Sequence, residues 1–239
     1  MDSSVGTVVI PAMGVSQRFK DHGYTKHKAL LKVQGTPIIK RICDTVPVNW
    51  NIRVVVPIEL AAEFYETLGY LGDRLELITL HGPTEGQSQT ILRGILGLNA
   101  AKPVMVTNCD LEADRDVVRL FSEHPSSVVM CHFHPEGPAI YSYLSFVANR
   151  LIDNIAEKQR VGSWAQTGWW RFNRTGDLHK AIALQIQLDK RHTNGEFYLS
   201  GALQVYKPPL YAYCLVHSSS WRDYGTPEAM IQQGLEIIG

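Results

Sequence analysis

An arginine and a lysine close to a loop of small residues are the first groups in this chain that could do chemistry. The apolar run 7–11 leads into Gly14 and Ser16, with Arg18 in the same loop and Lys28 further on. Small residues let backbone N–H groups approach a ligand closely, and the two cations supply positive charge. The combination suits the triphosphate of a nucleotide, although an ordinary strand-to-helix turn with solvated basic residues has the same composition.

Two aspartates stand where a carboxylate could bind a cation. Asp110 follows the apolar segment 104–107, and Asp223 lies just before Thr226-Pro227, which is a typical helix start. A carboxylate held at the end of a buried strand is a good ligand for a hard cation. Each aspartate could equally serve in a turn or at a helix cap, so both interpretations stay open at this point.

Lys158 and Glu196 are the polar residues of the second half that could bind a substrate. Lys158 follows Glu157 at the end of an alternating apolar segment and could hold a phosphate as a point charge. A surface ion pair between these two residues is the simpler alternative. Glu196 could hydrogen-bond a polyol or begin a helix. Four aromatic residues could stack on a sugar, but we expect at least two of them in the core: Trp164, Trp169, Trp170 and Phe172.

Several other chemistries are disfavoured by the residue spacing. His132 and His134 lie two residues apart on a predicted strand without a third ligand nearby, so we expect exposed histidines rather than a zinc site. The chain contains no GxSxG, GxxxxGK[ST] or GxGxxG pattern. Acyl transfer, P-loop phosphoryl transfer and Rossmann dinucleotide binding are therefore not expected.

The elements that must position these residues alternate between strand and helix in the first half. Strands are predicted over 7–11, 52–57, 75–80 and 104–107, with helices over 37–46, 59–68 and 85–99, the last with Thr84 as its N-cap. This alternation predicts a parallel sheet with right-handed crossovers. Ligands bind beyond the carboxyl ends of such strands, which is where the 12–28 segment and Asp110 fall.

The second half changes character and predicts a mixed or antiparallel layer. Strands are expected over 127–133, 139–148, 150–157, 168–173 and 211–216, with helices near 114–123, over 176–188 and from Thr226 onward. The fold class predicted for the whole chain is an α/β three-layer sandwich. Its central sheet is mostly parallel, and its C-terminal portion is mixed or antiparallel.

The composition indicates one globular domain over 1–239. Apolar residues make up 45% of the chain, which suffices for a sizeable core. Lys plus Arg equals Asp plus Glu at 23 each, so the chain as a whole has no bias toward polyanions. Residues 1–50 hold seven basic residues against three acidic ones. Such a local excess fits a small phosphate ligand better than a nucleic-acid surface.

The cysteine pattern and the lack of targeting signals predict a cytoplasmic protein. The four cysteines form no CxxC pair, and we expect them to be reduced and mostly buried: Cys43, Cys109, Cys131 and Cys214. No segment resembles a signal peptide, and none is long and apolar enough to cross a bilayer. We therefore expect no membrane partner and no nucleic-acid partner, and leave open whether the chain forms a homo-oligomer.

Taken in order, these segments resemble the sugar-phosphate nucleotidyltransferases, the nucleoside-diphosphate-sugar pyrophosphorylases of the GT-A-like α/β fold. The family's P-[AM]-[AG]-G-x-G-x-R-F loop is similar to residues 11–19, and its P-K-P-L motif to residues 27–30. Later motifs of the family are similar to Gly35-Thr36-Pro37, Asn108-Cys109-Asp110, Glu157-Lys158, Gly168-Trp169-Trp170, Asn194-Gly195-Glu196 and Trp221-Arg222-Asp223. Each motif is weak alone, but together and in this order they cover nearly the whole chain.

The resemblance implies a role for each matching residue. Residues 1–125 would form the nucleotide-binding half and residues 126–239 the sugar-phosphate-binding half. The catalytic cations would be Arg18, Lys28 and Lys158. The nucleotide would be bound by Ala12, Met13, Gly14, Ser16, His81, Gly86, Gln87 and Asn108. The sugar phosphate would face Glu157, Gly168 and Glu196, and Asp110 and Asp223 would hold Mg²⁺.

The reaction implied by the resemblance joins a nucleoside triphosphate to a sugar 1-phosphate. A phosphate oxygen of the sugar phosphate attacks the α-phosphorus in line, and pyrophosphate leaves. The protein supplies positioning and charge neutralisation, so no activated serine or cysteine is needed.

Three positions depart from the family pattern. Ser16 replaces the second glycine of the loop, which fits only if this position does not require a positive φ. His27 and Ala29 replace the prolines on either side of Lys28, so we expect a less rigid lysine loop.

Other functions fit parts of the same pattern. The acceptor could be a non-sugar phosphate such as phosphocholine, bound by a cation box of Trp164, Trp169 and Trp170. The chain could instead be a non-catalytic nucleotide-binding regulatory domain, although both candidate metal aspartates are present. A glycosyltransferase is disfavoured, because the strand end reads Asn108-Cys109-Asp110 rather than D-x-D.

Overall fold

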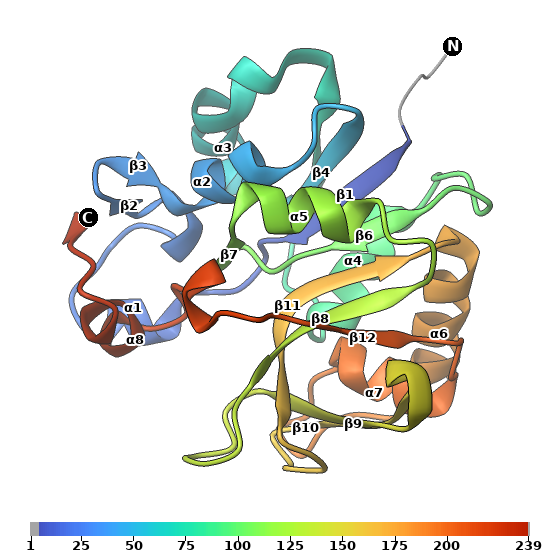
Figure 1. Cartoon of the computed structure of the whole chain (residues 1–239). Helices are drawn as coiled ribbons and strands as arrows, with labels where there is room; N and C mark the ends of the chain where they lie inside the picture. Colours follow the sequence, from blue (N-terminus) through green and yellow to red (C-terminus); the bar gives the residue numbers. More distant parts are fainter. Residues whose placement is uncertain (1–4, 239) are drawn as a thin grey trace.

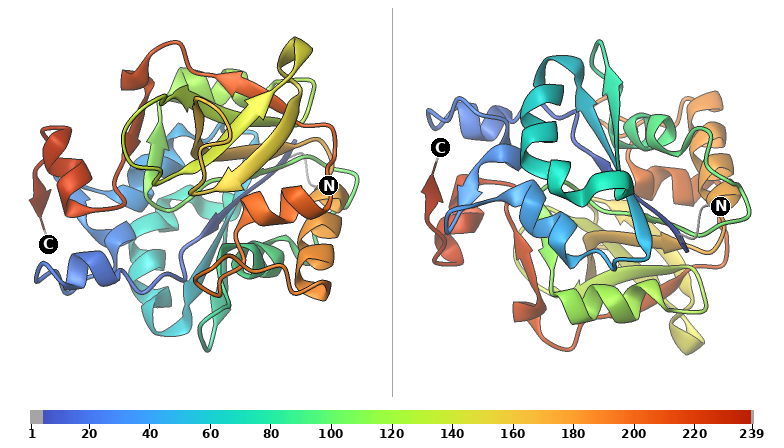
Figure 2. Two further views of the ribbon diagram at one scale, coloured as in Figure 1. Left: turned by 90° about the horizontal axis from the view of Figure 1, so that it is seen from below. Right: turned by 90° about the horizontal axis from the view of Figure 1, so that it is seen from above.

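The computed structural model describes residues 5–238 and has three layers, with helices on both faces of a central sheet (Figures 1 and 2). Within these residues the sheet has nine strands, and its main path runs β10-β9-β11-β6-β1-β4-β5. Strand β8 pairs with β11, and β12 pairs with β8. This is the predicted α/β sandwich.

The first half forms the parallel part of the sheet, as predicted. Strand β1 pairs in parallel with β4 and β6, and β4 pairs in parallel with β5. The bounds of these strands are β1 Gly6–Pro11, β4 Trp50–Pro57, β5 Leu75–Leu80 and β6 Val104–Val106. The helices between them are α2 Ile38–Thr45, α3 Ala61–Leu68 and α4 Gln87–Ile95.

The second half is mostly antiparallel. Strand β11 pairs antiparallel with β6, β8 and β9, whereas β12 pairs in parallel with β8. The strands are β8 Val128–Phe133, β9 Ser142–Phe146, β10 Ile152–Glu157, β11 Trp164–Phe172 and β12 Tyr211–Cys214. The helices are α5 Arg115–Ser122, α6 Thr175–Gln187, α7 Leu199–Val205 and α8 Pro227–Gln232. Because β11 pairs with β6, one sheet joins the two halves of the chain.

The central strands of the sheet bury side chains on both faces. Val8 and Ile10 belong to the core that also contains buried residues of α2, α3 and α5, while Val9 between them belongs to the core on the opposite face, where β1 contacts α4. Trp169 and Trp170 of β11 likewise point to opposite faces of the sheet, one into each core, and both are fully buried. Alternate residues of a strand point to opposite faces, which produces this division. Burying each Val, Ile or Leu side chain contributes about 1.5–3 kcal/mol, so the two cores hold the sheet edge in place.

Short elements at the carboxyl edge of the sheet complete the fold. A two-stranded ribbon joins β7 to β13, and a small sheet has the order β14-β2-β3, so that the last residues of the described chain lie beside β2 (Figure 1). The bounds are α1 Gln17–Lys20, β2 Lys32–Val33, β3 Thr36–Pro37, β7 Leu111–Ala113, β13 Trp221–Asp223 and β14 Ile237–Ile238. None of these ribbons was predicted, because two or three residues are too few to show a period.

Two local predictions were wrong. The helix expected over 85–99 begins only at Gln87, because Gly86 is the N-cap with φ of 126°, and Thr84 instead contacts Thr90 Oγ1 at 2.6 Å. A Cβ at Gly86 would lie 2.6 Å from the backbone nitrogen of Phe197, so only glycine fits there. His132 is buried rather than exposed, at 6% accessibility, because Trp221 and Tyr141 pack on its ring.

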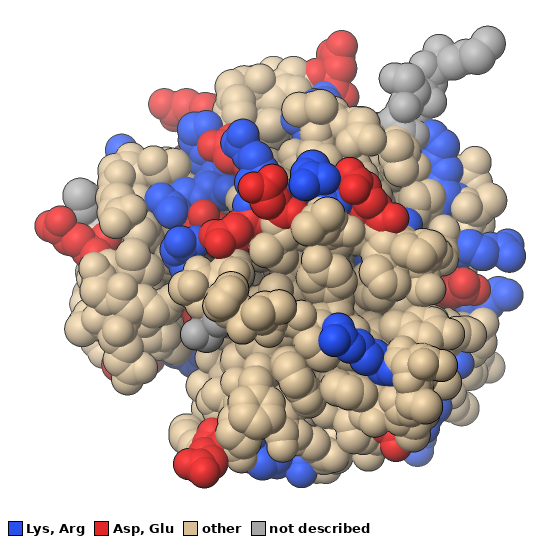
Figure 3. Space-filling model, viewed as in Figure 1, with Lys and Arg blue, Asp and Glu red and all other residues tan. Residues whose placement is uncertain are grey.

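Charges of both signs are interspersed on the surface. Around α5, Lys and Arg side chains lie beside Asp and Glu side chains (Figure 3), and Arg119 is within 4 Å of both Asp116 and Glu123. This agrees with the equal numbers of basic and acidic residues. Among residues 5–238, no helix combines the length and the apolar character needed to cross a bilayer.

Candidate active site

A pocket of about 390 Å³ opens at the carboxyl edge of the parallel strands, and we call it the central pocket. Its wall combines the loop after β1, the end of β6, the ends of β9 and β10, and the end of β13. Nine residues predicted to act in the site line it: Ser16, Arg18, Lys28, Gln87, Asn108, Asp110, Glu157, Lys158 and Asp223. The topology therefore gathers residues that are more than 200 positions apart in the chain.

Lys28 and Asp110 form an ion pair in this pocket. Lys28 Nζ lies 2.5 Å from Asp110 Oδ2, and both side chains are largely buried. Burial by itself would lower the pKa of Lys28, but the negative charge of Asp110 and its hydrogen bond outweigh this effect and raise that pKa above its ordinary value. Lys28 is consequently a permanent cation at the centre of the pocket.

Asp110 and Asp223 approach each other on the β7–β13 ribbon. Asp223 is the cross-strand partner of Leu111, and the backbone N–H of Tyr224 donates to the carbonyl oxygen of Asp110 at 2.8 Å. A Cβ at Gly225 would lie 2.9 Å from Asp223 Oδ1 and 3.5 Å from Asp110 Oδ2, so both carboxylates face the same small space. Burial and the neighbouring charge of Asp110 raise the pKa of Asp223.

These two carboxylates fit a divalent cation. Mg²⁺ is usually held by one or two carboxylates, with phosphate oxygens and water completing the octahedron. A cation between the two side chains would relieve the repulsion that raises the pKa of Asp223. The phenol of Tyr141 and the backbone N–H of Gly225 already donate to Asp223, at 3.1 and 2.7 Å, and orient it. Across residues 5–238, no group of three or more His, Cys, Asp and Glu side chains is arranged around one metal position.

The loop after β1 is held in an unusual backbone conformation. Ser16 has φ of 59° and so lies in the left-handed region. From the sequence, a serine was expected to fit only if this position did not require a positive φ. This conformation costs a non-glycine residue about 1–2 kcal/mol. The Ser16 hydroxyl offsets part of that cost by accepting the backbone N–H of Lys28 at 2.9 Å. The serine thus links the loop to the backbone of Lys28, which glycine could not do.

One side of the central pocket is formed by β9, β10 and the residue before α7. The Glu157 carboxylate accepts hydrogen bonds from the hydroxyls of Ser142 and Ser200, the latter at 3.0 Å. Lys158 has a left-handed backbone with φ of 51°, and its Nζ lies 5.4 Å from the ring centre of Tyr198. Lys158 and Glu157 therefore present a cation and an anchored carboxylate side by side.

A second pocket of about 460 Å³, which we call the side pocket, lies on the other side of the 14–16 loop. Met13, Gly14, His27 and His81 contribute to a wall that is mainly apolar. Gln87 stands on the central-pocket side, where its Nε2 donates to Asn108 Oδ1 at 2.6 Å and its Oε1 accepts the N–H of Leu199 at 3.2 Å. The segment 13–18 contributes to both pockets, with Met13, Gly14 and Val15 in the side pocket and Ser16, Gln17 and Arg18 in the central pocket.

Residues 8–169 match the MobA-like NTP transferase domain. That match spans more than half of the 239 residues. The chain belongs to this family. It is accordingly a nucleotidyltransferase. A separate comparison with curated proteins found no match to its sequence.

Solved structures of other nucleotidyltransferases share the fold of this NTP transferase. A nucleoside-diphosphate-sugar pyrophosphorylase from Vibrio cholerae RC9 has a TM-score of 0.80 at 21% identity, covering 94% of this chain and 98% of that one. An inositol-1-phosphate CTP transferase from T. maritima has a TM-score of 0.74 at 14% identity, covering 95% and 91%. At these identities the likeness concerns the fold.

The structure does not bring all predicted residues of this NTP transferase to a pocket wall. Ala12 is fully buried in the core, and Gly86 lies against Phe197. Gly168, predicted to face the sugar, has φ of 85° and packs on Leu111, where any Cβ would overlap the leucine side chain. Glu196, also predicted to face the sugar, is exposed and accepts a hydrogen bond from Asn194 at 3.0 Å outside both pocket walls.

The tryptophan box proposed for a cationic acceptor does not exist in this NTP transferase. Trp169 and Trp170 lie in separate cores on opposite faces of the sheet, and Trp164 packs on Phe133 and Phe146. Three rings that point in different directions cannot surround one cation. The expectation that at least two of these aromatics belong to the core is confirmed.

The residues of the central-pocket wall that sequence reasoning missed include Tyr141, Gln166 and Tyr198. Tyr141 lies within the strand predicted over 139–148 and Gln166 just before the one predicted over 168–173, and neither has a charged neighbour that would mark it. Tyr198 follows Asn194-Gly195-Glu196, and the charged Glu196 was predicted as the substrate contact instead of Tyr198, two residues later. A helix start at Leu199 is the signal that would have pointed to Tyr198 as the N-cap.

Proposed function

We propose that this enzyme transfers the nucleotidyl group of a nucleoside triphosphate to a sugar 1-phosphate, with Mg²⁺ as cofactor and pyrophosphate as the second product. The observation that carries the proposal is the cluster of Lys28, Asp110 and Asp223 between the 14–18 loop and Lys158. This cluster stands where two phosphate-bearing ligands would meet.

The donor nucleotide would lie across the 14–16 loop. The base would occupy the side pocket near Met13 and His81, and the triphosphate would follow the loop into the central pocket. Arg18 and Lys28 would neutralise the charge that accumulates on the α-phosphate and the leaving pyrophosphate. Lys28 suits this role because Asp110 keeps it protonated throughout the physiological pH range.

The acceptor would enter from the side of β10. Its phosphate would bind to Lys158, and its hydroxyls would meet Glu157, Gln166 and Tyr198. A phosphate oxygen is already anionic at neutral pH, so the attack on the α-phosphorus needs orientation rather than a general base. The likeness to a nucleoside-diphosphate-sugar pyrophosphorylase and to an inositol-1-phosphate CTP transferase supports a phosphorylated polyol as acceptor.

Asp110 and Asp223 would hold Mg²⁺, and Tyr141 would keep the Asp223 carboxylate in place. When bound, the cation neutralises phosphate charge and polarises the reacting phosphoryl group. Lys28, which is paired with Asp110 at 2.5 Å, would stand beside this site and present its charge to the phosphates.

The proposal is tested by measuring pyrophosphate release with each of the four common NTPs against a panel of sugar 1-phosphates, inositol 1-phosphate and phosphocholine. We expect release only when an NTP, a sugar 1-phosphate and Mg²⁺ are all present, and its loss in Asp110→Asn. Release of orthophosphate without an acceptor would indicate simple hydrolysis. Phosphocholine as the best acceptor, or activity unaffected by EDTA, would contradict the proposal.

A further inference from the structure

The ribbon that carries Asp110 and Asp223 is too short to be stable by itself. Strands β7 and β13 form three residue pairs, from Trp221–Ala113 to Asp223–Leu111, and the Tyr224 N–H to Asp110 bond extends them by one contact. An isolated two-stranded ribbon is at best marginally stable in water, even when it is longer than this. Contacts from outside the ribbon must therefore fix the geometry of the two carboxylates.

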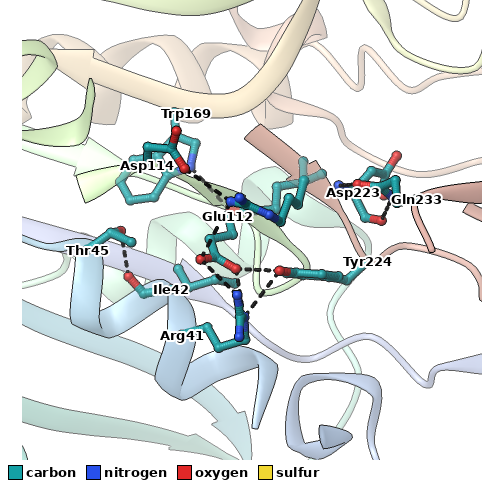
Figure 4. Close-up of polar contacts among 11 residues, drawn as sticks. Arg41, Ile42, Thr45, Glu112, Asp114, Trp169, Asp223, Tyr224 and Gln233 are labelled. Carbon is teal, nitrogen blue, oxygen red and sulfur yellow. Dashed lines mark hydrogen bonds and ion pairs between the residues drawn. The ribbon is translucent and has the colours of Figure 1, made fainter. Parts of the chain in front are cut away.

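A buried polar network beneath the ribbon supplies such contacts (Figure 4). Glu112 of β7 accepts hydrogen bonds from Arg41 Nε at 2.8 Å and Arg41 Nη2 at 3.4 Å. The hydroxyl of Tyr224 donates to the same carboxylate and accepts from Arg41 Nε at 3.2 Å. Tyr224 is fully buried and Glu112 nearly so. The network joins helix α2, strand β7 and the residue that follows β13.

The backbone around the ribbon is fixed at two further points. Trp169 Nε1 of β11 donates to the carbonyl oxygen of Leu111 at 3.2 Å. Gln233, just after α8, accepts the Asp223 N–H at 3.2 Å and donates to the Asp223 carbonyl at 2.7 Å (Figure 4). These bonds hold each strand separately, whereas side chains link the two segments at two points. The Tyr224 hydroxyl bonds Glu112, and Arg222 Nη1 of β13 donates to Asp114 Oδ1 at 3.1 Å and lies 4.0 Å from Glu112 Oε1.

We propose that Arg41, Glu112 and Tyr224 are positioning residues that set the distance between the Asp110 and Asp223 carboxylates and thereby the affinity of the site for a divalent cation. The inference rests on the proposed function, which assigns the cation to these two aspartates. The three side chains lie outside the wall of the central pocket, so they act through the backbone. Glu112 is two residues from Asp110, and Tyr224 is adjacent to Asp223.

The chemistry of the network suits this role. Arg41 satisfies the charge of Glu112 with a bidentate pair, so this carboxylate does not compete with Asp110 and Asp223 for a cation. The Tyr224 hydroxyl adds a directional bond that a phenylalanine of the same shape would lack. Partners one layer behind metal ligands typically change metal affinity by about 10–100-fold when they are removed.

The test compares Tyr224→Phe with the control Tyr143→Phe. Tyr143 is also fully buried and its hydroxyl bonds His134 Nδ1 at 2.8 Å, but it lies on β9 away from the ribbon. Binding of Mn²⁺ alone to each protein would be followed by electron paramagnetic resonance. We expect a dissociation constant about 10-fold higher in Tyr224→Phe and unchanged within about twofold in Tyr143→Phe. The Mg²⁺ concentration for half-maximal activity should rise by the same factor, with the rate at saturating Mg²⁺ retained.

A second readout does not depend on the metal. Amide hydrogen exchange at residue 224, whose N–H bonds Asp110, should become faster in Tyr224→Phe but not in Tyr143→Phe. Arg41→Lys, which keeps the charge and loses the bidentate geometry, should shift both readouts in the same direction. If Tyr224→Phe binds Mn²⁺ as tightly as the wild type, the positioning role of the network is overturned, but the proposed metal site is not. A wild-type protein that binds no Mn²⁺, or Asp110→Asn and Asp223→Asn variants that still bind it, would overturn the proposed metal site itself.

Discussion

His27 donates from Nε2 to the carbonyl oxygen of Gly14 across 2.9 Å, which ties the segment of Lys28 to the loop after β1. Its other ring nitrogen, Nδ1, accepts the backbone N–H of Ala29 at 3.2 Å. These two bonds require a neutral imidazole with its proton on Nε2. The sequence predicted a less rigid segment here because His27 and Ala29 replace two prolines, whereas the histidine holds both sides of Lys28 by hydrogen bonds.

The first prediction concerns the pH dependence of stability. Burial lowers the pKa of His27 from 6.5 to about 4, so the unfolded chain takes up a proton before the folded protein does. Stability should therefore fall as the pH drops from 6.5 toward 4. For His27 this loss is about 2–3 kcal/mol. His27→Gln cannot titrate and should lose that much less between pH 7 and pH 4.5 in urea unfolding.

Burial also lowers the pKa of His132 to about 4. Because His132 is present in both proteins, its contribution to the loss of stability cancels in this comparison. An equal loss of stability in the wild type and in His27→Gln would show that His27 is not held neutral by the fold.

The second prediction separates the two roles of Ser16. Ser16→Ala keeps the strained φ of 59° and removes the acceptor of the Lys28 N–H, so we expect a loss of about 1–3 kcal/mol in the free energy of unfolding. Ser16→Gly loses the same bond but relaxes the backbone, and should be about 1 kcal/mol more stable than the alanine variant. Equal stabilities would mean that the position is not strained. Chemical denaturation of both variants measures the difference.

The third prediction concerns Gly168, which sequence reasoning assigned to the sugar. A Cβ there would overlap Leu111 beside Asp110, so Gly168→Ala should destabilise the protein by about 2–4 kcal/mol through overpacking and backbone strain. The control Gly195→Ala has a similar φ of 83° with open space around it and should show the strain alone.

Adding Leu111→Ala to Gly168→Ala should restore part of the lost stability, because it removes the overlapping atoms. Strict additivity of the two single changes in a double-mutant cycle would contradict this account, since contacting residues couple and distant ones do not.

The fourth prediction assigns Arg18 and Lys158 to different substrates. Both line the central pocket, Arg18 from the segment after β1 and Lys158 from the end of β10. Lys158→Ala should raise the KM for the acceptor phosphate about 10-fold or more and leave the KM for the NTP within about twofold. Arg18→Ala should have the reverse effect. Steady-state kinetics with each substrate varied in turn gives both constants, and the same shift in both variants would contradict the assignment.

The parallel half of the fold could be predicted because its strands are continuous apolar runs with polar residues at their carboxyl ends. Asp110 and Lys28 were predicted for the same reason. The β7–β13 ribbon could not be predicted, since Glu112 and Tyr224 meet only after the sheet has brought residues more than a hundred positions apart together. Gly168 and Glu196 were assigned to the sugar from motifs, but packing against Leu111 and the Asn194 turn determine where they lie.

The central claim is that an acceptor phosphate attacks the α-phosphorus of an NTP in the pocket of Lys28 and Asp110. Phosphorus-31 NMR of the enzyme with an NTP, a sugar 1-phosphate and Mg²⁺ observes both products directly. The account predicts the paired signals of a sugar–phosphate–phosphate–nucleoside diester growing together with that of pyrophosphate, and neither signal in Asp110→Asn. Orthophosphate with a nucleoside diphosphate, or no reaction with any acceptor, would contradict it.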